Sequence, residues 1–274
     1  MHEKKAIRLI VAVFLLTLIL IPLTALTGRG RRHMFKGEEA TKDIIFEEEH
    51  IFITPDAAIQ KKGSTVEILR GGTYVVKGEL SDGQIVVDTG SEEEVTLKLN
   101  GVSLACSFGS PIYVKQAKKL TLKLKDGDEN LIVDKRKAEE DKDLEKACIY
   151  ARSDLKVKGE GSLTVKGGNW HGLFSSKDLK IKSGTIRVEA EGHGLHGKKS
   201  VLIEDGSLDI KAGTNGIHSR GTLDITGGKV HIDAGRYGMY AFTHLIVKEG
   251  AKVTVKNALS EAGCHGKMEY SLWQ

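Results

Sequence analysis

The chain has 274 residues, of which 32 are glycine and only 3 are proline, whereas average proteins contain about 7% glycine and about 5% proline. With 40% hydrophobic and 28% charged residues, the composition excludes a disordered polymer and a membrane protein with many spans. The formal net charge of +4 comes from residues 1–33, which hold six Lys or Arg and one Glu, so the nearly neutral remainder gives no electrostatic reason to expect a nucleic-acid partner.

Residues 1–33 combine a basic start with an apolar run at residues 9–26. This order is typical of a secretory signal peptide. The same run, coiled as a helix, would span about 27 Å, close to the roughly 30 Å of a bilayer core, so an uncleaved anchor is the alternative. We therefore predict a signal peptide or an N-terminal membrane anchor, which contacts the membrane only if it is uncleaved, and a secreted or cell-surface location for the rest of the chain.

Residues 34–70 contain two strand-like stretches, at 44–46 and 51–54, and are predicted to form an N-terminal cap together with the first strands. A cap is expected because the open end of a sheet exposes unpaired backbone groups. Further along, residues 126–147 carry a charged run, which indicates a loop or short helix that projects from the fold as an insertion.

A repeat of about 22 residues runs from residue 154 to residue 267. Two sets of glycines keep this spacing: Gly184, Gly206, Gly228 and Gly250, and Gly172, Gly194, Gly216 and Gly238. Between the glycines, apolar and polar residues alternate in three short stretches per unit, a pattern that predicts three strands. Such a unit cannot bury its own apolar face, so successive units must stack.

The length of the unit decides between repeat architectures. Propeller blades need about 40 residues or more, and leucine-rich repeats need a different apolar frame. We therefore predict an all-β fold, a single parallel β-helix or solenoid over residues 71–274, with one coil of about 22 residues per unit. Equivalent residues of neighbouring coils would then stand about 4.8 Å apart.

Stacking turns each repeat position into a column. If the apolar residue that opens the third strand points inward, the next residue points outward. The outward column is predicted to hold rings, with two more in the adjoining turns: Tyr113, Tyr150, Phe174, His196, His218 and Tyr240, beside Trp170 and Tyr237. Rings pack against the apolar faces of sugars and their polar atoms bond hydroxyls, so the column is a candidate polysaccharide-binding site. The alternative is that the rings only stabilise the stack.

Histidine and cysteine are residue types that commonly bind metal ions, so both sets are considered as ligands. Two neighbouring columns hold four histidines: His171, His193, His196 and His218. Two imidazoles on adjacent coils could share a transition metal, yet no carboxylate or Cys completes a ligand set, so no metal site is predicted. Three cysteines lack the spacing of a zinc site or a disulfide framework and are expected to be buried thiols: Cys106, Cys148 and Cys264.

The sequence carries no enzyme signature. Nucleophile-elbow, zinc-protease, P-loop and kinase motifs are all missing, and paired carboxylates such as Glu139 and Glu140, or Asp141 and Asp143, lie in the charged segment 126–147, where a solvated face is expected. No catalytic residue is predicted, and the chain is expected not to be an enzyme.

Five stretches carry a family resemblance: residues 71–76 (GGTYVV), 82–88 (DGQIVVD), 95–102 (VTLKLNGV), 112–115 (IYVK) and 159–165 (GEGSLTV). With the repeats that follow, they resemble a family of secreted bacterial carbohydrate-binding β-helix proteins. The resemblance implies a right-handed parallel β-helix, similar to that of pectate lyases, that binds plant-type polysaccharides including cellulose and acidic galacturonans. It also implies calcium, held by the aspartates of an Asp-Asp-Gly-Ile turn.

The chain departs from that turn in every coil. Residues 170–173 (WHGL), 192–195 (GHGL), 214–217 (TNGI) and 236–239 (RYGM) keep the glycine and the apolar residue but have neither acid. Because calcium needs carboxylate or carbonyl oxygens, the chain's own residues predict no cofactor.

The leading hypothesis is an extracytoplasmic protein that binds a polysaccharide along the ring column without cleaving it. Two alternatives stay open: a polysaccharide lyase or hydrolase on the same scaffold, and a structural or adhesive cell-surface protein.

Overall fold

The computed structural model describes residues 42–48, 50–137 and 146–270. These residues form 27 β-strands and no α-helix. Accordingly, nothing in the described ranges is a helix long and apolar enough to cross a membrane. The predicted signal peptide or anchor, residues 1–33, lies outside the described residues, and the folded strands belong to one compact unit that begins at Ala40.

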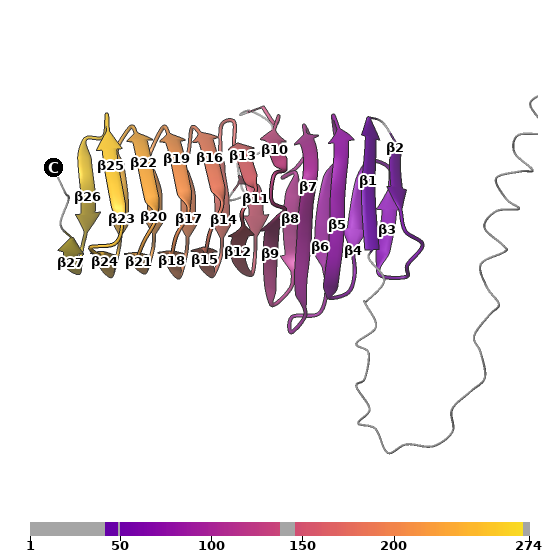
Figure 1. Ribbon diagram of the computed structural model, residues 1–274, viewed down its shortest axis with the longest axis horizontal. Coiled ribbons are helices and arrows are strands. Elements are labelled where there is room, and N and C mark those ends of the chain that lie inside the picture. The colour runs from indigo at the N-terminus through magenta and orange to yellow at the C-terminus, as the bar shows by residue number, and fades with distance from the viewer. Residues whose placement is uncertain (1–41, 49, 138–145, 271–274) are drawn as a thin grey trace, which may run out of the picture. The chain divides into compact units, whose positions relative to one another are not determined.

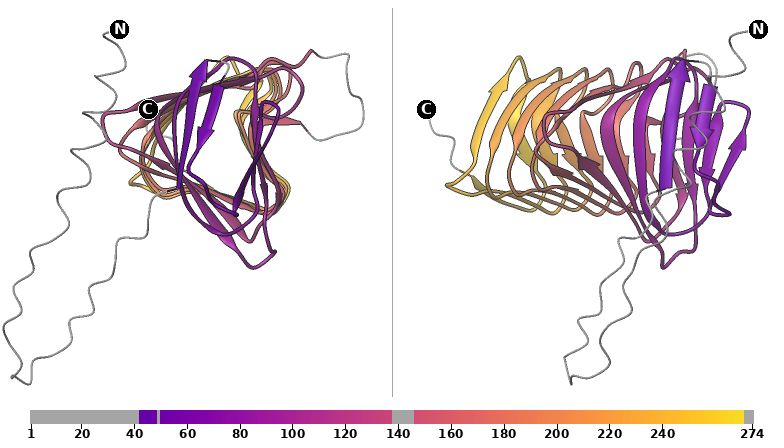
Figure 2. Two further views of the ribbon diagram at one scale, coloured as in Figure 1. Left: turned by 90° about the vertical axis from the view of Figure 1, so that its right-hand side faces the viewer. Right: turned by 45° about the vertical axis from the view of Figure 1, so that its right-hand side comes forward.

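The body is a parallel β-solenoid of about 9 turns of about 23 residues, drawn as successive coils in Figure 1. The predicted all-β parallel β-helix is therefore confirmed. The view along the solenoid in Figure 2 shows the coils superposed around one interior. Each regular coil contributes one strand to each of three faces, which we name face A, face B and face C.

Face A contains the strand that opens each coil. Its strands are β1 (Lys42–Glu48), β5 (Gly72–Leu80), β7 (Glu94–Cys106), β9 (Lys119–Leu124), β12 (Asp154–Gly159), β15 (Asp178–Ile181), β18 (Ser200–Ile203), β21 (Thr222–Ile225), β24 (His244–Val247) and β27 (Lys267–Tyr270).

Face B follows in each coil and belongs to the same 17-stranded sheet, because the long strand β7 pairs with strands of both faces. Its strands are β10 (Glu129–Asp134), β13 (Ser162–Lys166), β16 (Thr185–Ala190), β19 (Ser207–Ala212), β22 (Lys229–Ala234) and β25 (Lys252–Lys256). Strand β2 (His50–Ile53) joins this sheet as the antiparallel partner of β1.

Face C is a 10-stranded sheet. Its strands are β3 (Ile59–Lys62), β4 (Thr65–Ile68), β6 (Gln84–Asp88), β8 (Ile112–Gln116), β11 (Ala147–Ala151), β14 (His171–Ser175), β17 (Leu195–Gly197), β20 (Ile217–Ser219), β23 (Tyr237–Ala241) and β26 (Ser260–Cys264). The pair β3 and β4 is antiparallel, so antiparallel pairs occur only at the N-terminal end of the described solenoid.

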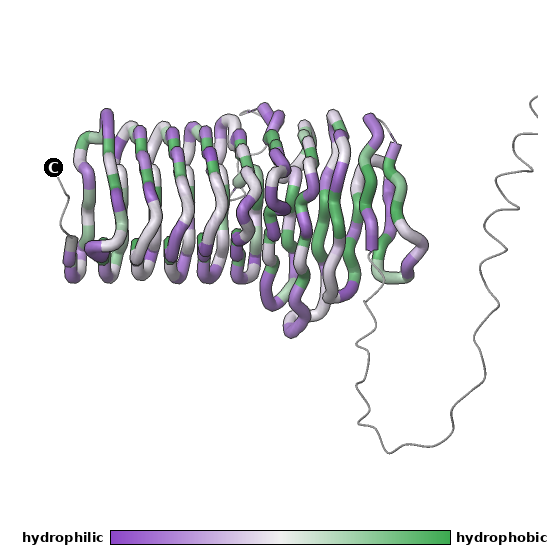
Figure 3. The backbone as a smooth tube through the Cα atoms, viewed as in Figure 1, coloured by the Kyte–Doolittle hydropathy of each residue, from purple (hydrophilic) through white to green (hydrophobic). Residues whose placement is uncertain are grey.

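Apolar side chains at every second position of the strands fill the interior of the solenoid. On face C the inward column Leu173, Leu195, Ile217 and Met239 pairs in register and has no exposed surface. Hydrophilic stretches recur at matching positions on successive coils in Figure 3. Because every coil adds the same apolar positions to the stack, burial of each coil depends on its two neighbours.

The two sets of repeating glycines are required for different physical reasons. Gly206 and Gly228, in the turns from face A to face B, have φ angles of 116° and 84°, a region that side chains with a Cβ rarely adopt. Gly194, before face C, faces a packed interior instead. A Cβ there would stand 2.3 Å from Ile210 Cγ2 and 2.7 Å from the Gly216 carbonyl oxygen, so close approach of the coils requires the second set.

The predicted insertion at residues 126–147 is narrower than expected, because residues 129–134 form the regular strand β10. The strand was hidden because its inward positions include two polar residues, Asn130 and Asp134, which are 2% and 5% exposed. Asn130 Oδ1 accepts a hydrogen bond from the Val102 amide, and its Nδ2 donates to the Ser162 carbonyl. Residues 138–145 lie outside the described part of the chain.

The expectation of three buried thiols holds for two cysteines. Cys106 and Cys148 are buried, whereas Cys264 on the last strand of face C is only half-buried. Burial raises the pKa of Cys106 to about 11 and that of Cys148 well above its ordinary value, so both remain protonated thiols near neutral pH. Cys264 differs because no further coil among the described residues covers that end of face C.

Candidate functional site

The ring column lies on face C in the predicted register. Tyr113, Tyr150, Phe174, His196, His218 and Tyr240 are paired across β8, β11, β14, β17, β20 and β23. Neighbouring ring centroids along this column are 5.5, 4.8, 4.9, 4.6 and 5.4 Å apart. Parallel pairing in constant register places one ring on each coil.

The middle of the column is not the open platform that the sequence suggested. Phe174 has no exposed surface and His196 is 3% exposed, although Phe174 lies outside the interior apolar cluster. The Phe174 ring stacks on Tyr150 with planes 3° apart, meets His196 edge-on, and lies 5.7 Å from the Lys198 ammonium. These two residues are therefore buried on the outer side of the sheet, which corrects the expectation that both face a ligand.

Accessible rings remain at the N-terminal end of the column. Tyr113 and Tyr150 are half-buried, and the Arg152 guanidinium lies 5.7 Å from the Tyr113 ring centroid. Burial raises the pKa of Tyr113, so its hydroxyl stays protonated and can donate to a hydroxyl oxygen.

The C-terminal end carries a larger group of rings. His218 and Tyr240 lie 5.4 Å apart, Tyr237 lies 5.3 Å from Tyr240, and the Arg236 guanidinium lies 5.4 Å from the Tyr237 ring. Two residues absent from the sequence prediction join them: His265 lies 6.0 Å from Tyr240 and 5.1 Å from Phe242. Phe242 is 57% exposed. Its 22-residue equivalents are Ser176, Lys198 and Arg220, so comparing the position after each strand would have singled it out.

Trp170 stands apart from the ring column. Its side chain is half-buried in the turn before β14, and the buried Lys146 ammonium lies 4.3 Å from its ring centroid. A ring held by a buried cation in this way contributes a cation–π contact to the turn. Tyr237, the other turn residue of the prediction, contacts Tyr240 directly.

Three histidines come close enough to suggest a metal site. One nitrogen from each of His171, His193 and His196 lies within 4.8 Å of the others. The His171 and His193 rings, however, stack with centroids 4.7 Å apart and planes 11° apart. A metal lies near the plane of each imidazole that binds it, and two parallel, stacked planes do not share such a point.

Hydrogen bonds also engage the Nδ1 atoms of His171 and His193, so these atoms are not available to bind a metal. The His193 amide donates to His171 Nδ1 at 2.9 Å, and the Asn215 amide donates to His193 Nδ1 at 3.3 Å, beside Thr214 Oγ1 at 2.8 Å. A neutral imidazole that accepts at Nδ1 carries its proton at Nε2. The arrangement thus fits a ladder that binds turn amides, and it does not fit a preformed metal site.

Burial keeps the imidazoles of His193, His196 and His218 neutral. Desolvation, reinforced by neighbouring histidines, lowers the pKa of His193 to about 2 and that of His196 further. Desolvation, with Arg220 as the next cause, lowers the pKa of His218 to about 4. Neutral imidazoles of this kind are poor proton acceptors near neutral pH.

Calcium, implied by the family resemblance, does not fit the turns of this chain either. The two positions in each turn that would supply acids hold no acid; they are Trp170 and His171, Gly192 and His193, Thr214 and Asn215, and Arg236 and Tyr237. Only Asn215 offers a side-chain oxygen of the amide type, and its Oδ1 is buried without a partner among the described residues. One amide oxygen falls far short of the six to eight oxygen ligands that calcium takes, so we derive no step through calcium.

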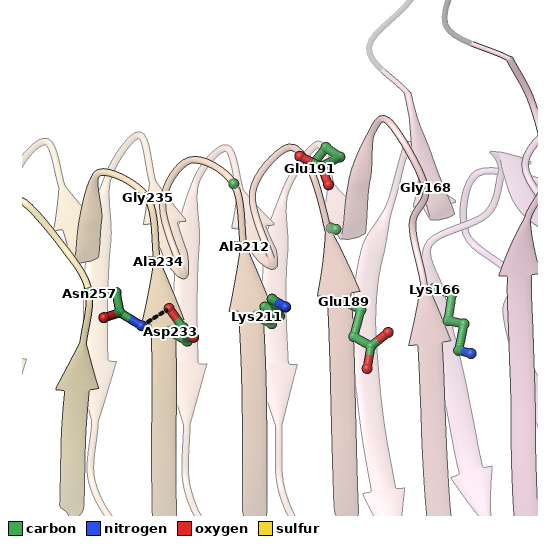
Figure 4. A pocket seen from close by; sticks show the side chains of 12 residues that line it. Lys166, Gly168, Glu189, Glu191, Lys211, Ala212, Asp233, Ala234, Gly235 and Asn257 are labelled. Carbon is green, nitrogen blue, oxygen red and sulfur yellow. Dashed lines mark hydrogen bonds between the residues drawn. The ribbon is translucent and has the colours of Figure 1, made fainter.

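A groove of about 480 Å³ crosses face B near the turns to face C. Figure 4 shows its charged side chains on successive strands. Lys166, Glu189, Lys211 and Asp233 occupy one register position in successive coils, and Lys256 continues the column beyond the groove. Opposite charges therefore alternate along this groove, and Asn257 Nδ2 donates to Asp233 Oδ1 at 3.0 Å. The sequence prediction did not include this site.

Comparisons with known proteins agree with the geometry. The family model described as carbohydrate-binding domain-containing protein matches residues 62–269. A carbohydrate-binding domain-containing protein of Acetivibrio thermocellus is 35% identical over 191 residues, which cover 67% of this chain and 65% of that relative. The match therefore spans slightly less than two thirds of the relative's length.

A solved structure is also similar. It is described as a polysaccharide lyase-like protein from C. thermocellum, in a gadolinium derivative. The TM-score is 0.80 at 33% sequence identity, and the superposition covers 84% of this chain and 97% of that chain. Given the family match over most of its length, the chain belongs to the family of carbohydrate-binding domain-containing proteins.

Proposed function

We propose that the protein binds a polysaccharide, without cleaving it, through the two accessible ends of the ring column on face C. The observation that carries the proposal is the register of the column, which sets one ring on each successive coil at centroid spacings of 4.6 to 5.5 Å. A linear polymer of sugars can follow such a row. Membership of a carbohydrate-binding family supports the ligand class.

The ends of the column offer both contacts that a sugar needs. The faces of Tyr237 and Tyr240 suit the apolar face of a pyranose ring, and the phenol hydroxyls at both ends of the column, including those of Tyr113 and Tyr150, suit its hydroxyl groups. Arg152 and Arg236 lie beside these rings and supply additional donors. The exposed Phe242 extends the C-terminal end beyond the register column.

Binding without cleavage is favoured by the chemistry of the column. The described register positions from Tyr113 to Tyr240 contain no carboxylate, whereas glycoside hydrolysis commonly uses a pair of them. Burial lowers the pKa values of the two imidazoles in the column, His196 and His218, far below neutrality, which makes them poor general bases.

Cleavage remains the second candidate function because of the groove on face B. Glu189, Glu191 and Asp233 line it together with Lys211, and the similar solved structure is described as polysaccharide lyase-like. A lyase or hydrolase would release shorter chains from a polysaccharide panel, and Glu189→Gln or Asp233→Asn would abolish that release.

The extracytoplasmic location is part of the same proposal. It rests on the basic and apolar residues 1–33. Expressing the full chain and fractionating the cells tests it: we expect the protein in the medium or on the outer surface, and recovery in the cytosol would contradict it.

The binding test uses the full chain, purified in a mild detergent, against soluble and insoluble polysaccharides with and without a chelator. We expect binding that survives the chelator and falls about tenfold or more in a Tyr237→Ala, Tyr240→Ala variant. The matched control is Phe52→Ala, which removes a ring that is 51% exposed on β2, away from the column. Equal binding by all three proteins would reject the ring column as the site.

A further inference from the structure

Face A carries a column of lysines in register. Lys98 pairs with Lys123, and Lys123 pairs with Lys158. Lys182 lies beside Lys158, because its amide donates to the carbonyl of Val157 at 2.9 Å. A second, shorter column beside it contains Lys156 and Lys180, which also pair directly. We call these two rows the lysine columns.

Like charges directly opposite each other destabilise a sheet. Acidic side chains form ion pairs with only some of the lysines in the columns, so part of the repulsion remains. Lys180 and Lys182 both pair with Glu204 at one end of the columns. At the other end, Glu94 pairs with the neighbouring Lys119 at 2.8 Å. Within the described residues, Lys98, Lys123 and Lys158 form no ion pair. Burial and the surrounding lysines lower the pKa of Lys156, which reflects the same crowding of positive charge.

The solenoid does not impose this crowding. On face B, one register position alternates in sign through Lys166, Glu189, Lys211, Asp233 and Lys256. That column, like the lysine columns, places one residue per coil on neighbouring parallel strands. Because the scaffold accommodates an alternating column, the uniform sign on face A calls for a cause outside the fold.

A hollow opens at the same place. Its volume is about 660 Å³, and its lining includes Lys98, Asn100, Lys123 and Lys125. Two acidic residues, Asp126 and Glu160, also line the hollow, and Lys125 pairs with Asp128 at 3.3 Å. The unpaired ammonium groups of Lys98 and Lys123 therefore line a recess that is large enough for a ligand group.

We infer that the lysine columns form a docking site for a linear polymer with one phosphodiester charge per repeat, other than a nucleic acid. Four lysines in three steps of about 4.8 Å span about 14 Å, which matches a row of charges and exceeds a single ion. The site lies on face A, so it is independent of the ring column proposed on face C.

The choice of lysine points to the tetrahedral phosphodiester group. Arginine's planar fork forms bidentate pairs with carboxylate and with phosphate, whereas a lysine ammonium binds phosphate as a compact point charge. A row of point charges without that planar fork suits a tetrahedral group that carries one charge per repeat. The two columns contain lysine only. They also contain no aromatic ring on which a base could stack, the contact that single-stranded nucleic acids use.

The test compares two triple variants that change net charge equally. Lys98→Gln, Lys123→Gln, Lys158→Gln removes the uniform column, and Lys166→Gln, Lys211→Gln, Lys256→Gln removes the lysines of the alternating column. The full chain and both variants are titrated with poly(glycerol phosphate), polygalacturonate and single-stranded DNA, with chelator present, at about 50 and about 200 mM salt.

We expect poly(glycerol phosphate) to bind most tightly, to weaken steeply with salt, and to weaken about tenfold or more in the face A variant only. Thermal unfolding checks the fold of each variant: removing the unrelieved repulsion should keep or raise the melting temperature of the face A variant. No binding of poly(glycerol phosphate), equal weakening in both variants, or tighter binding of polygalacturonate or DNA would each overturn the inference.

Discussion

The middle and the ends of the ring column occupy equivalent positions of the same repeat, yet they differ in environment. Phe174 and His196 are almost fully buried, whereas Tyr150, His218 and Tyr240 keep accessible surface. The same periodic position can thus serve packing in one coil and ligand contact in another. Burial on the outer side of a sheet, which periodicity does not reveal, decides between the two roles.

The largest effect is expected in the middle of the column. Phe174→Ala removes a fully buried ring that stacks on Tyr150 and meets His196 edge-on, and buried Phe to Ala substitutions destabilise by about 3 to 5 kcal/mol. Denaturant unfolding measures this loss. A change below about 1 kcal/mol would contradict the assignment of a packing role to this ring.

Lowering the pH is expected to reduce the free energy of unfolding through the buried histidines beside Phe174. Unfolded histidines take up protons below a pKa of about 6.5, whereas the folded pKa is about 2 for His193 and about 4 for His218. The unfolded state therefore binds more protons as the pH falls below about 6.5, and stability present above that pH is lost. Full burial would give about 1.4 kcal/mol per histidine per pH unit, and partial exposure reduces this. Unfolding free energies from pH 7.5 to 5 that stay flat would contradict the neutral stack.

Replacing His196 by phenylalanine should stabilise the middle of the ring column. Both ring nitrogens of His196 are buried without a hydrogen-bond partner in the described part of the chain. His196→Phe replaces them with apolar atoms of similar shape, and we expect a gain of about 1 kcal/mol at pH 7 that grows toward pH 5. The Tyr240→Phe variant is the matched control at an accessible end, where the expected change is near zero. A loss of stability in His196→Phe would point to an unrecognised role of the imidazole.

The smallest change in stability is expected from a charge reversal on face B. Glu189→Lys would place like charges opposite Lys166 and Lys211, so the alternating column would resemble the lysine columns. We expect a loss of about 0.5 to 1 kcal/mol that shrinks at high salt. An unchanged melting temperature at low salt would mean that neighbouring charges in register interact little in this solenoid. It would also weaken the argument from repulsion on face A.

The sequence predicts the coil and the ring register because one fixed period governs both. The 22-residue glycine spacing determines which residues pair, so Phe174, His196 and His218 were placed correctly in one column. Their exposure could not be predicted, since it depends on neighbours such as Lys198, whose repeat position holds a different residue type in each coil.

Other features were hidden by local irregularity. Strand β10 was missed because polar Asn130 and Asp134 occupy inward positions and find partners there. The lysine columns were missed because the step from Lys123 to Lys158 spans the irregular coil that contains β10, so no constant spacing links the two residues. Regular spacing reveals a column only where each coil has the same length.

Hydroxyl-radical footprinting of the polysaccharide complex tests the ring column most directly, because it reports the accessibility of each ring with and without ligand. We expect protection of Tyr237, Tyr240 and Phe242, with Tyr113 and Tyr150 at the other end, and no change at the exposed Phe52. Unchanged labelling of these tyrosines in a complex that demonstrably forms would contradict binding along face C.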